Sequence, residues 1–281
     1  MDEASNAAPP TEPVKKGHPI GFWFFFWGEF AERCSYYGMR AILALYMTER
    51  LGFSKADSGT FMSLFIAACY FLPLLGGYIA DNFFGKYWTI VGFSVPYVFG
   101  QFLVGFENQY LLFISLVLLA MGSGVIKPNI STLMGLTYDQ QRPGQEKLRT
   151  SAFSWFYFAI NVGAALSQFL LPAVRDAHGY RTAFLVPAFF MAVALVIFAS
   201  GKRFYAVEVV GQAKHLTPEE RKERMRVLGR IGSLFILVMF FWAIFDQAAS
   251  TWIFFADTYM DTTIAGESDA GGTVLMSGET V

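Results

Sequence analysis

Apolar stretches long enough to cross a bilayer alternate with short polar segments along this chain. Seven such stretches are 19 to 28 residues long, and a helix of about 20 residues spans a hydrocarbon core about 30 Å thick. They cover residues 20–47, 59–80, 87–106, 110–133, 151–174, 182–200 and 231–255. Each stretch is continuous and lacks the period-two alternation of a barrel strand, so helices are predicted. The predicted fold class is an all-α polytopic membrane protein.

Composition agrees with a membrane protein and excludes several other classes. Apolar residues make up 54% of the 281 residues, whereas charged residues make up 15%, compared with about 25% in a typical soluble domain. The net charge of −1 provides no basic field for nucleic acid, and both cysteines lie in apolar stretches, which excludes a disulfide scaffold. The chain has no zinc-ligand spacing and no phosphate-loop motif. We therefore predict neither an enzyme nor a metal or cofactor site.

Lysine and arginine residues are distributed unevenly between alternate loops. Fourteen of the 21 lie in the N-terminal segment and in the loops after the second, fourth and sixth stretches, whereas four lie in the other loops and three lie inside spans. Because basic residues accumulate on the cytoplasmic side, the N-terminus is predicted to be cytoplasmic. The predicted location is a multi-pass protein of the plasma (inner) membrane.

The same boundaries divide the chain into five segments. They are a cytoplasmic N-terminal tail (1–19), a six-helix bundle (20–200), a cytoplasmic linker with a short helix (201–230), a seventh transmembrane helix (231–256) and an external loop or disordered tail (257–281). In the linker, Thr217 precedes Pro218 and Glu220, the pattern of a helix start with a capping box. The basic residues that follow are interpreted as a cytoplasmic anchor, with a specific lipid or partner site as the alternative.

The first span contains four charged residues, although one charge near the bilayer centre costs about 2.5–3.5 kcal/mol. With successive residues about 100° apart, the charged and tyrosine side chains fall within about 140° of arc, which predicts a polar stripe facing the bundle interior. The members of this stripe are Glu29, Glu32, Arg33, Tyr36, Tyr37 and Arg40. The spacing of Glu29 and Arg33 permits an ion pair. A purely structural salt bridge is the alternative, but two acids and two bases exceed what one such pair needs.

Two later spans also contain a charged side chain. Lys127 in the fourth span is expected to pair with Glu29 or Glu32 across a close, glycine-assisted helix contact; the alternative is that it extends to the cytoplasmic surface. Asp246 in the seventh span is a candidate proton carrier, with a satisfied hydrogen-bonding residue as the alternative. Asn161 and Tyr70 are weaker polar candidates.

The polar stripe of the first span belongs to a longer sequence motif. The sequence Glu29-Phe-Ala-Glu32-Arg33-Cys34-Ser-Tyr36-Tyr37-Gly38 resembles the E-x-x-E-R-F-x-Y-Y-G motif of the proton-dependent oligopeptide transporter (POT) family, within the major facilitator superfamily. Cys34 stands where the motif usually has phenylalanine. Four further segments are similar to family segments: residues 76–86, 127–129, 156–164 and 241–247.

This resemblance implies proton-coupled symport of di- and tripeptides by alternating access, with protons as the coupling ion and no cofactor. It implies that Arg33 and Lys127 bind the peptide carboxylate. The residues that it places at the substrate are Arg33, Tyr37, Tyr70, Lys127, Asn161 and Trp242. Those that it assigns to proton coupling are Glu29, Glu32 and Asp246, and those of the gating motif are Gly77, Asp81 and Gly85.

The family has at least twelve spans in two six-helix halves, whereas seven are predicted here. The resemblance therefore implies the superfamily's N-terminal six-helix bundle plus the seventh helix, with the C-terminal half missing. The expected partners are a small peptide, protons, the lipid bilayer and a separate C-terminal half or a full-length relative, but no nucleic acid. Two alternatives stay open: the same scaffold carrying another small anion such as nitrate, and a non-transporting truncated form that associates with a full-length relative.

Overall fold

A computed structural model describes residues 16–211 and 217–260, which form helices joined by short connections and contain no strand. The helices are α1 (Ile20–Glu49), α2 (Lys55–Ile79), the π-helical turn η1 (Ala80–Phe84), α3 (Gly85–Val104), α4 (Gln109–Gln141), α5 (Glu146–Ser200), the 3₁₀ turn η2 (Lys202–Phe204), α6 (Pro218–Phe245), the 3₁₀ turn η3 (Asp246–Ala249) and α7 (Thr251–Tyr259). Most of the predicted tails, residues 1–15 and 261–281, lie outside the described residues.

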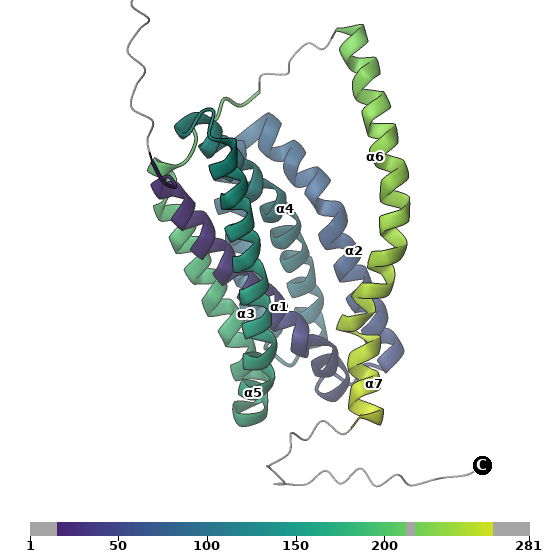
Figure 1. The fold of residues 1–281 in the computed structure, drawn as a ribbon. Helices are drawn as coiled ribbons and strands as arrows, with labels where there is room; N and C mark the ends of the chain where they lie inside the picture. Colours follow the sequence, from purple (N-terminus) through teal and green to yellow (C-terminus); the bar gives the residue numbers. More distant parts are fainter. Residues whose placement is uncertain (1–15, 212–216, 261–281) are drawn as a thin grey trace, which may run out of the picture.

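The predicted spans coincide with these helices, except that the third extends two residues beyond α3 and the seventh is divided between α6, η3 and α7. Two of the spans form one continuous element. The fifth and sixth spans are the two limbs of α5, which reverses direction at Gly179 (φ 81°, ψ 169°), a conformation that glycine adopts without strain (Figure 1). In the described residues, four helical stretches are long and apolar enough to cross a membrane: Lys55–Val104, Gln109–Gln141, Glu146–Ser200 and Pro218–Tyr259. The charged stripe keeps α1 out of this set, although α1 has 30 residues.

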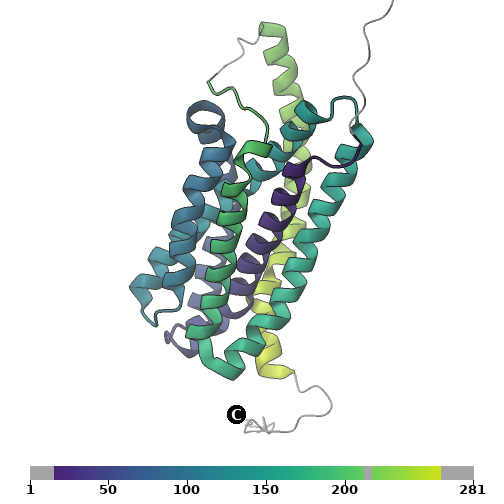
Figure 2. The same cartoon turned by 90° about the vertical axis from the view of Figure 1, so that its left-hand side faces the viewer.

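The helices of residues 20–200 pack as a bundle around α1 (Figures 1 and 2). The main contacts join α1 to α5, α3 to α4, and α2 to α4. α6 continues through η3 into α7 beside α2, and none of its described side chains is buried (Figure 1). The capping box predicted at Thr217 is present: its side chain accepts from the amide of Glu220, and the Glu220 side chain accepts from the amide of Thr217.

Small residues bring α2 and α4 into close contact. A Cβ added to Gly76 would lie 2.7 Å from the Cα of Val125, and one added to Gly124 would lie 2.6 Å from the Cβ of Leu72. Asn129 ties the crossing together because its Nδ2 donates to the carbonyl oxygen of Gly76 at 3.2 Å. The packing that glycines permit between membrane helices thus fixes the crossing of α2 and α4.

Candidate functional site

A buried ion cluster occupies the middle of α1. Arg33 Nε lies 2.9 Å from Glu29 Oε1 and also forms an ion pair with Glu32. Each of these three residues is 1% exposed. Tyr97 of α3 donates its hydroxyl to Glu32 Oε1 at 3.2 Å. The ion pair predicted from the spacing of Glu29 and Arg33 is therefore confirmed, and Glu32 shares the same guanidinium.

The charges of this cluster do not balance, because two carboxylates surround one guanidinium. Glu29 Oε2 and Arg33 Nη2 have no hydrogen-bond partner among the described residues. An excess buried charge is costly unless it is paired or neutralised. One proton bound to the cluster would remove the imbalance, so the cluster has the composition of a proton-binding site.

A second, more open group of side chains joins α1 to the region around η3. Arg40 Nη2 lies 3.2 Å from Asp246 Oδ1, and the Arg40 guanidinium carbon lies 5.6 Å from the centre of the Tyr36 ring. Nearby, the ring centres of Tyr70 on α2 and Trp242 on α6 lie 6.3 Å apart. This group combines a cation, an acid and aromatic rings, which is the composition of a site for a polar organic ligand.

Lys127 borders the open group, and its charge also acts on Glu29, Glu32 and Arg33 of the buried cluster. Its Nζ lies 6.0 Å from the centre of the Tyr70 ring, and its side chain is exposed. The ion pair that we predicted between Lys127 and Glu29 or Glu32 is wrong for the described residues, where no carboxylate lies within 4.0 Å of its ammonium group. Arg33 sits on the same helix as both glutamates and already pairs with each of them.

The other residues predicted at the substrate differ in burial and in their contacts. Tyr37 is half-buried on α1, next to Tyr36, with the ring centres 5.2 Å apart. Asn161 is exposed on the first limb of α5, and its Nδ2 donates to the carbonyl oxygen of Tyr157 at 2.8 Å. Arg33 is closed off within the buried cluster, whereas Arg40 lies among the open group. Sequence reasoning placed Arg40 on the polar stripe but gave it no ligand role, although it lies two helical turns after Arg33 on the same face.

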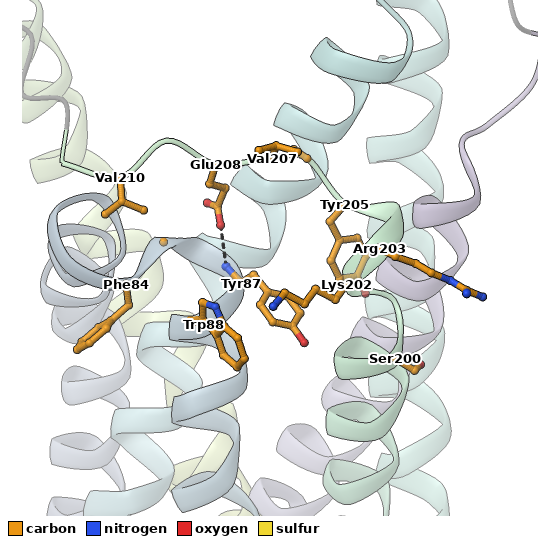
Figure 3. A pocket seen from close by; sticks show the side chains of 12 residues that line it. Phe84, Tyr87, Trp88, Ser200, Lys202, Arg203, Tyr205, Val207, Glu208 and Val210 are labelled. Carbon is orange, nitrogen blue, oxygen red and sulfur yellow. Dashed lines mark hydrogen bonds between the residues drawn. The ribbon is translucent and has the colours of Figure 1, made fainter.

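The predicted gating motif surrounds the turn between α2 and α3. Lys86 Nζ lies 2.8 Å from Asp81 Oδ1, and Gly85 adopts φ 76°. Glu208, from the segment after η2, accepts hydrogen bonds from the backbone amides of Lys86 at 2.8 Å and Tyr87 at 3.0 Å. Figure 3 shows the second of these bonds. The carboxylate therefore caps the N-terminus of α3, where amides lack helical partners. No sequence signal linked Glu208 to this helix. Gly77 faces open space, and Gly76 makes the close helix contact instead.

Comparison with known proteins gives consistent matches. Residues 87–217 and 207–269 match the sequence profile of the POT family. The chain is 34% identical over 312 residues to solute carrier family 15 member 1 of Rattus norvegicus, covering 89% of this chain and 43% of that protein. It is 33% identical to peptide transporter family 1 of Drosophila melanogaster, covering 93% of this chain and 40% of that protein.

Solved structures show the same likeness. The crystal structure of the POT family transporter PepTSo has a TM-score of 0.66 and 35% sequence identity, covering 71% of this chain and 40% of that chain. A POT family transporter in complex with 5-aminolevulinic acid has a TM-score of 0.64 and 30% identity, covering 88% of this chain and 51% of that chain. The chain spans less than half the length of the curated relatives that it matches.

Proposed function

This chain belongs to the POT family, and on that premise we propose that it forms the N-terminal part of a proton-coupled symporter for di- and tripeptides. The observation that supports this most is the open group, where Arg40 pairs with Asp246 while the exposed Lys127 has no acid within 4.0 Å among the described residues. Two cations near aromatic rings suit a peptide carboxylate. Similar proteins are named peptide transporters, which agrees with this ligand class.

The proposed coupling step is exchange of a proton for a carboxylate. A proton bound to Asp246 neutralises its side chain and releases Arg40, which then binds the peptide carboxylate together with Lys127. Tyr37, Tyr70, Trp242 and Asn161 line the site. The buried cluster of Glu29, Glu32 and Arg33 holds the second proton-binding position, since its extra carboxylate needs neutralisation. Protons are the coupling ion, and no cofactor is involved.

The proposed architecture follows the predicted division of the chain. Residues 20–200 form the six-helix bundle, 201–230 the cytoplasmic linker and 231–256 the seventh span. The N-terminus is cytoplasmic and the protein crosses the plasma membrane several times, which the uneven distribution of lysine and arginine supports. The gating motif of Gly77, Asp81 and Gly85 lies at the cytoplasmic end of this bundle. Alternating access requires two halves that rock about a central site, so a C-terminal half is the expected partner.

The test is transport in vesicles. The chain is reconstituted together with a C-terminal half from a POT relative, the outside is made acidic, and uptake of labelled dialanine and internal acidification are followed. We expect accumulation of peptide and peptide-dependent proton entry, both lost in Asp246→Asn. Peptide-independent proton flux, or no flux from an assembled complex, would reject the proposal.

A second candidate is transport of another small anion on the same scaffold. Arg40 and Lys127 recognise a carboxylate by its charge, and a nitrate ion offers the same feature. Uptake of each labelled solute separates the two functions: under the peptide proposal labelled dialanine accumulates and unlabelled dipeptide competes with it, whereas under the alternative labelled nitrate accumulates and dialanine does not. A chain that co-purifies with a full-length relative and changes no flux would indicate the non-transporting form.

A further inference from the structure

A cavity of about 760 Å³ lies at the end of the bundle where α1 begins, away from the open group (Figure 3). It is bounded by the start of α3, the end of α5 and the segment that follows η2. Apolar and aromatic side chains form most of its wall, and Lys202 provides a cation. Neither the proposed peptide site nor the gating motif uses Lys202.

The charge of Lys202 is available to a ligand. Its Nζ lies 4.2 Å from the centre of the Trp88 ring and 5.2 Å from that of Tyr87. Figure 3 shows Lys202 extending toward these rings, whereas Arg203 points away from them. Among the described residues, no carboxylate lies within 4.0 Å of the Lys202 ammonium group. Glu208 also lines the cavity, but its carboxylate is occupied by two backbone amides and by Lys86, 3.8 Å away.

An apolar track leads from this cavity along α3. Trp88, Gly92, Val95 and Phe99 are exposed and spaced four and three residues apart, so they lie on one face of the helix. A Cβ added to Gly92 meets nothing within 4 Å, so the face of α3 is open at this position, one turn from Trp88. A tryptophan at the end of an apolar helix face is typical of the membrane interface.

We propose that this cavity binds the headgroup of an anionic phospholipid from the cytoplasmic leaflet. Lys202 pairs with the lipid phosphate, Trp88 lies at the level of the headgroup, and one acyl chain follows the open apolar face of α3 past Gly92. The apolar track distinguishes this ligand from free phosphate, which needs the cation alone. The cation distinguishes an anionic lipid from a zwitterionic one, whose own positive group competes with Lys202 for the phosphate.

The test uses bromine quenching of Trp88 in the full 281-residue chain. The protein is reconstituted in dioleoylphosphatidylcholine vesicles that contain dibrominated phosphatidylglycerol or, in a parallel set, dibrominated phosphatidylcholine. The signal of Trp88 is the difference between each protein and its Trp88→Phe counterpart. We expect stronger quenching by phosphatidylglycerol in the wild-type chain. Lys202→Gln should lower the relative affinity for phosphatidylglycerol about fivefold, which corresponds to about 1 kcal/mol for one basic residue at an anionic surface.

Two further variants make the test specific. Gly92→Leu keeps Lys202 but places a bulky side chain on the helix face along which the acyl chain lies. Its helix is expected to fold because the added side chain meets open space, and the variant should also lose the preference for phosphatidylglycerol. Lys222→Gln, which removes an exposed charge on α6, should keep it. Equal loss in Lys202→Gln and Lys222→Gln would overturn the proposal in favour of general surface attraction. Loss of the preference on adding inorganic phosphate, with Gly92→Leu unchanged, would overturn it in favour of a free-phosphate site.

Discussion

Arg40 and Asp246 form an ion pair between residues 206 positions apart in the chain, with Nη2 3.2 Å from Oδ1. Arg40 lies on α1 at the centre of the bundle, and Asp246 begins η3 at the end of α6. Both side chains are mostly buried, at 12% and 16% exposed. A proton that neutralised the acid would therefore weaken a contact between the six-helix bundle and the seventh predicted span.

Asp246→Asn should uncouple transport from protons. The amide keeps the shape of the side chain but binds no proton and leaves Arg40 without its ion pair. Close charge pairs with this degree of burial couple by about 1.5 kcal/mol or more, which predicts about a tenfold or larger loss of proton-driven dialanine uptake. Exchange of peptide across the vesicle without a gradient should be retained. Asp257→Asn, an exposed neighbour on α7, is the matched control and should transport normally.

Arg33→Gln should destabilise the fold far more than a change at either glutamate. Removing the guanidinium leaves Glu29 and Glu32 together in a buried site, at a cost of about 3–5 kcal/mol. Glu29→Gln leaves one carboxylate with one guanidinium and should cost much less. The free energy of unfolding in mixed detergent micelles measures both, with the exposed Arg226→Gln as control. Similar stabilities for Arg33→Gln and Glu29→Gln would contradict the charge imbalance described above.

Glu208→Gln should loosen the N-terminus of α3. The carboxylate accepts from the amides of Lys86 and Tyr87, and a charged cap at a helix N-terminus contributes about 1 kcal/mol beyond a neutral one. Glu208→Ala removes the acceptor entirely and should cost about 2 kcal/mol. Hydrogen exchange of the first turn of α3 should rise in both variants. Glu223→Gln on α6 should leave that exchange unchanged, and faster exchange throughout the bundle would argue against a local cap.

His18 should make the fold less stable in mild acid. Its Nδ1 lies 2.5 Å from the hydroxyl of Tyr138, and burial together with the nearby charge of Arg142 lowers its pKa from the ordinary 6.5. The unfolded chain therefore binds a proton at a higher pH than the folded chain does. Stability from this site is present above the unfolded pKa and falls as the pH drops through about 6.5 toward the lower folded value.

The measurement compares unfolding free energies at about pH 7 and about pH 5. From the higher to the lower pH, the unfolding free energy of His18→Gln should decrease less than that of the wild-type chain, because the glutamine side chain does not titrate. His178→Gln, an exposed histidine in the bend of α5, should behave as the wild-type chain does. An unchanged decrease in His18→Gln would assign the pH dependence to other groups.

Local spacing predicted the parts of the site that lie on one helix. The pair of Glu29 and Arg33 followed from four-residue spacing, and the seven apolar stretches followed from length alone. Contacts between distant segments did not follow: nothing in the sequence joined Arg40 to Asp246, or Glu208 to the start of α3. The pairing predicted for Lys127 was wrong because Arg33, on the same helix as the glutamates, already pairs with both of them.

The sequence also did not predict which of two adjacent residues contacts a neighbouring helix, although adjacent positions on a helix point about 100° apart. Gly76 and Gly77 are adjacent in the motif of residues 76–86, and of the two it is Gly76 that contacts α4. Gly76→Val should cost about 2 kcal/mol or more, since its Cβ would lie 2.7 Å from the Cα of Val125, a backbone atom that cannot move aside. Gly77→Val has open space and should cost less than about 0.5 kcal/mol. Unfolding free energies in micelles compare the two variants directly, and equal costs would mean that α2 and α4 cross elsewhere.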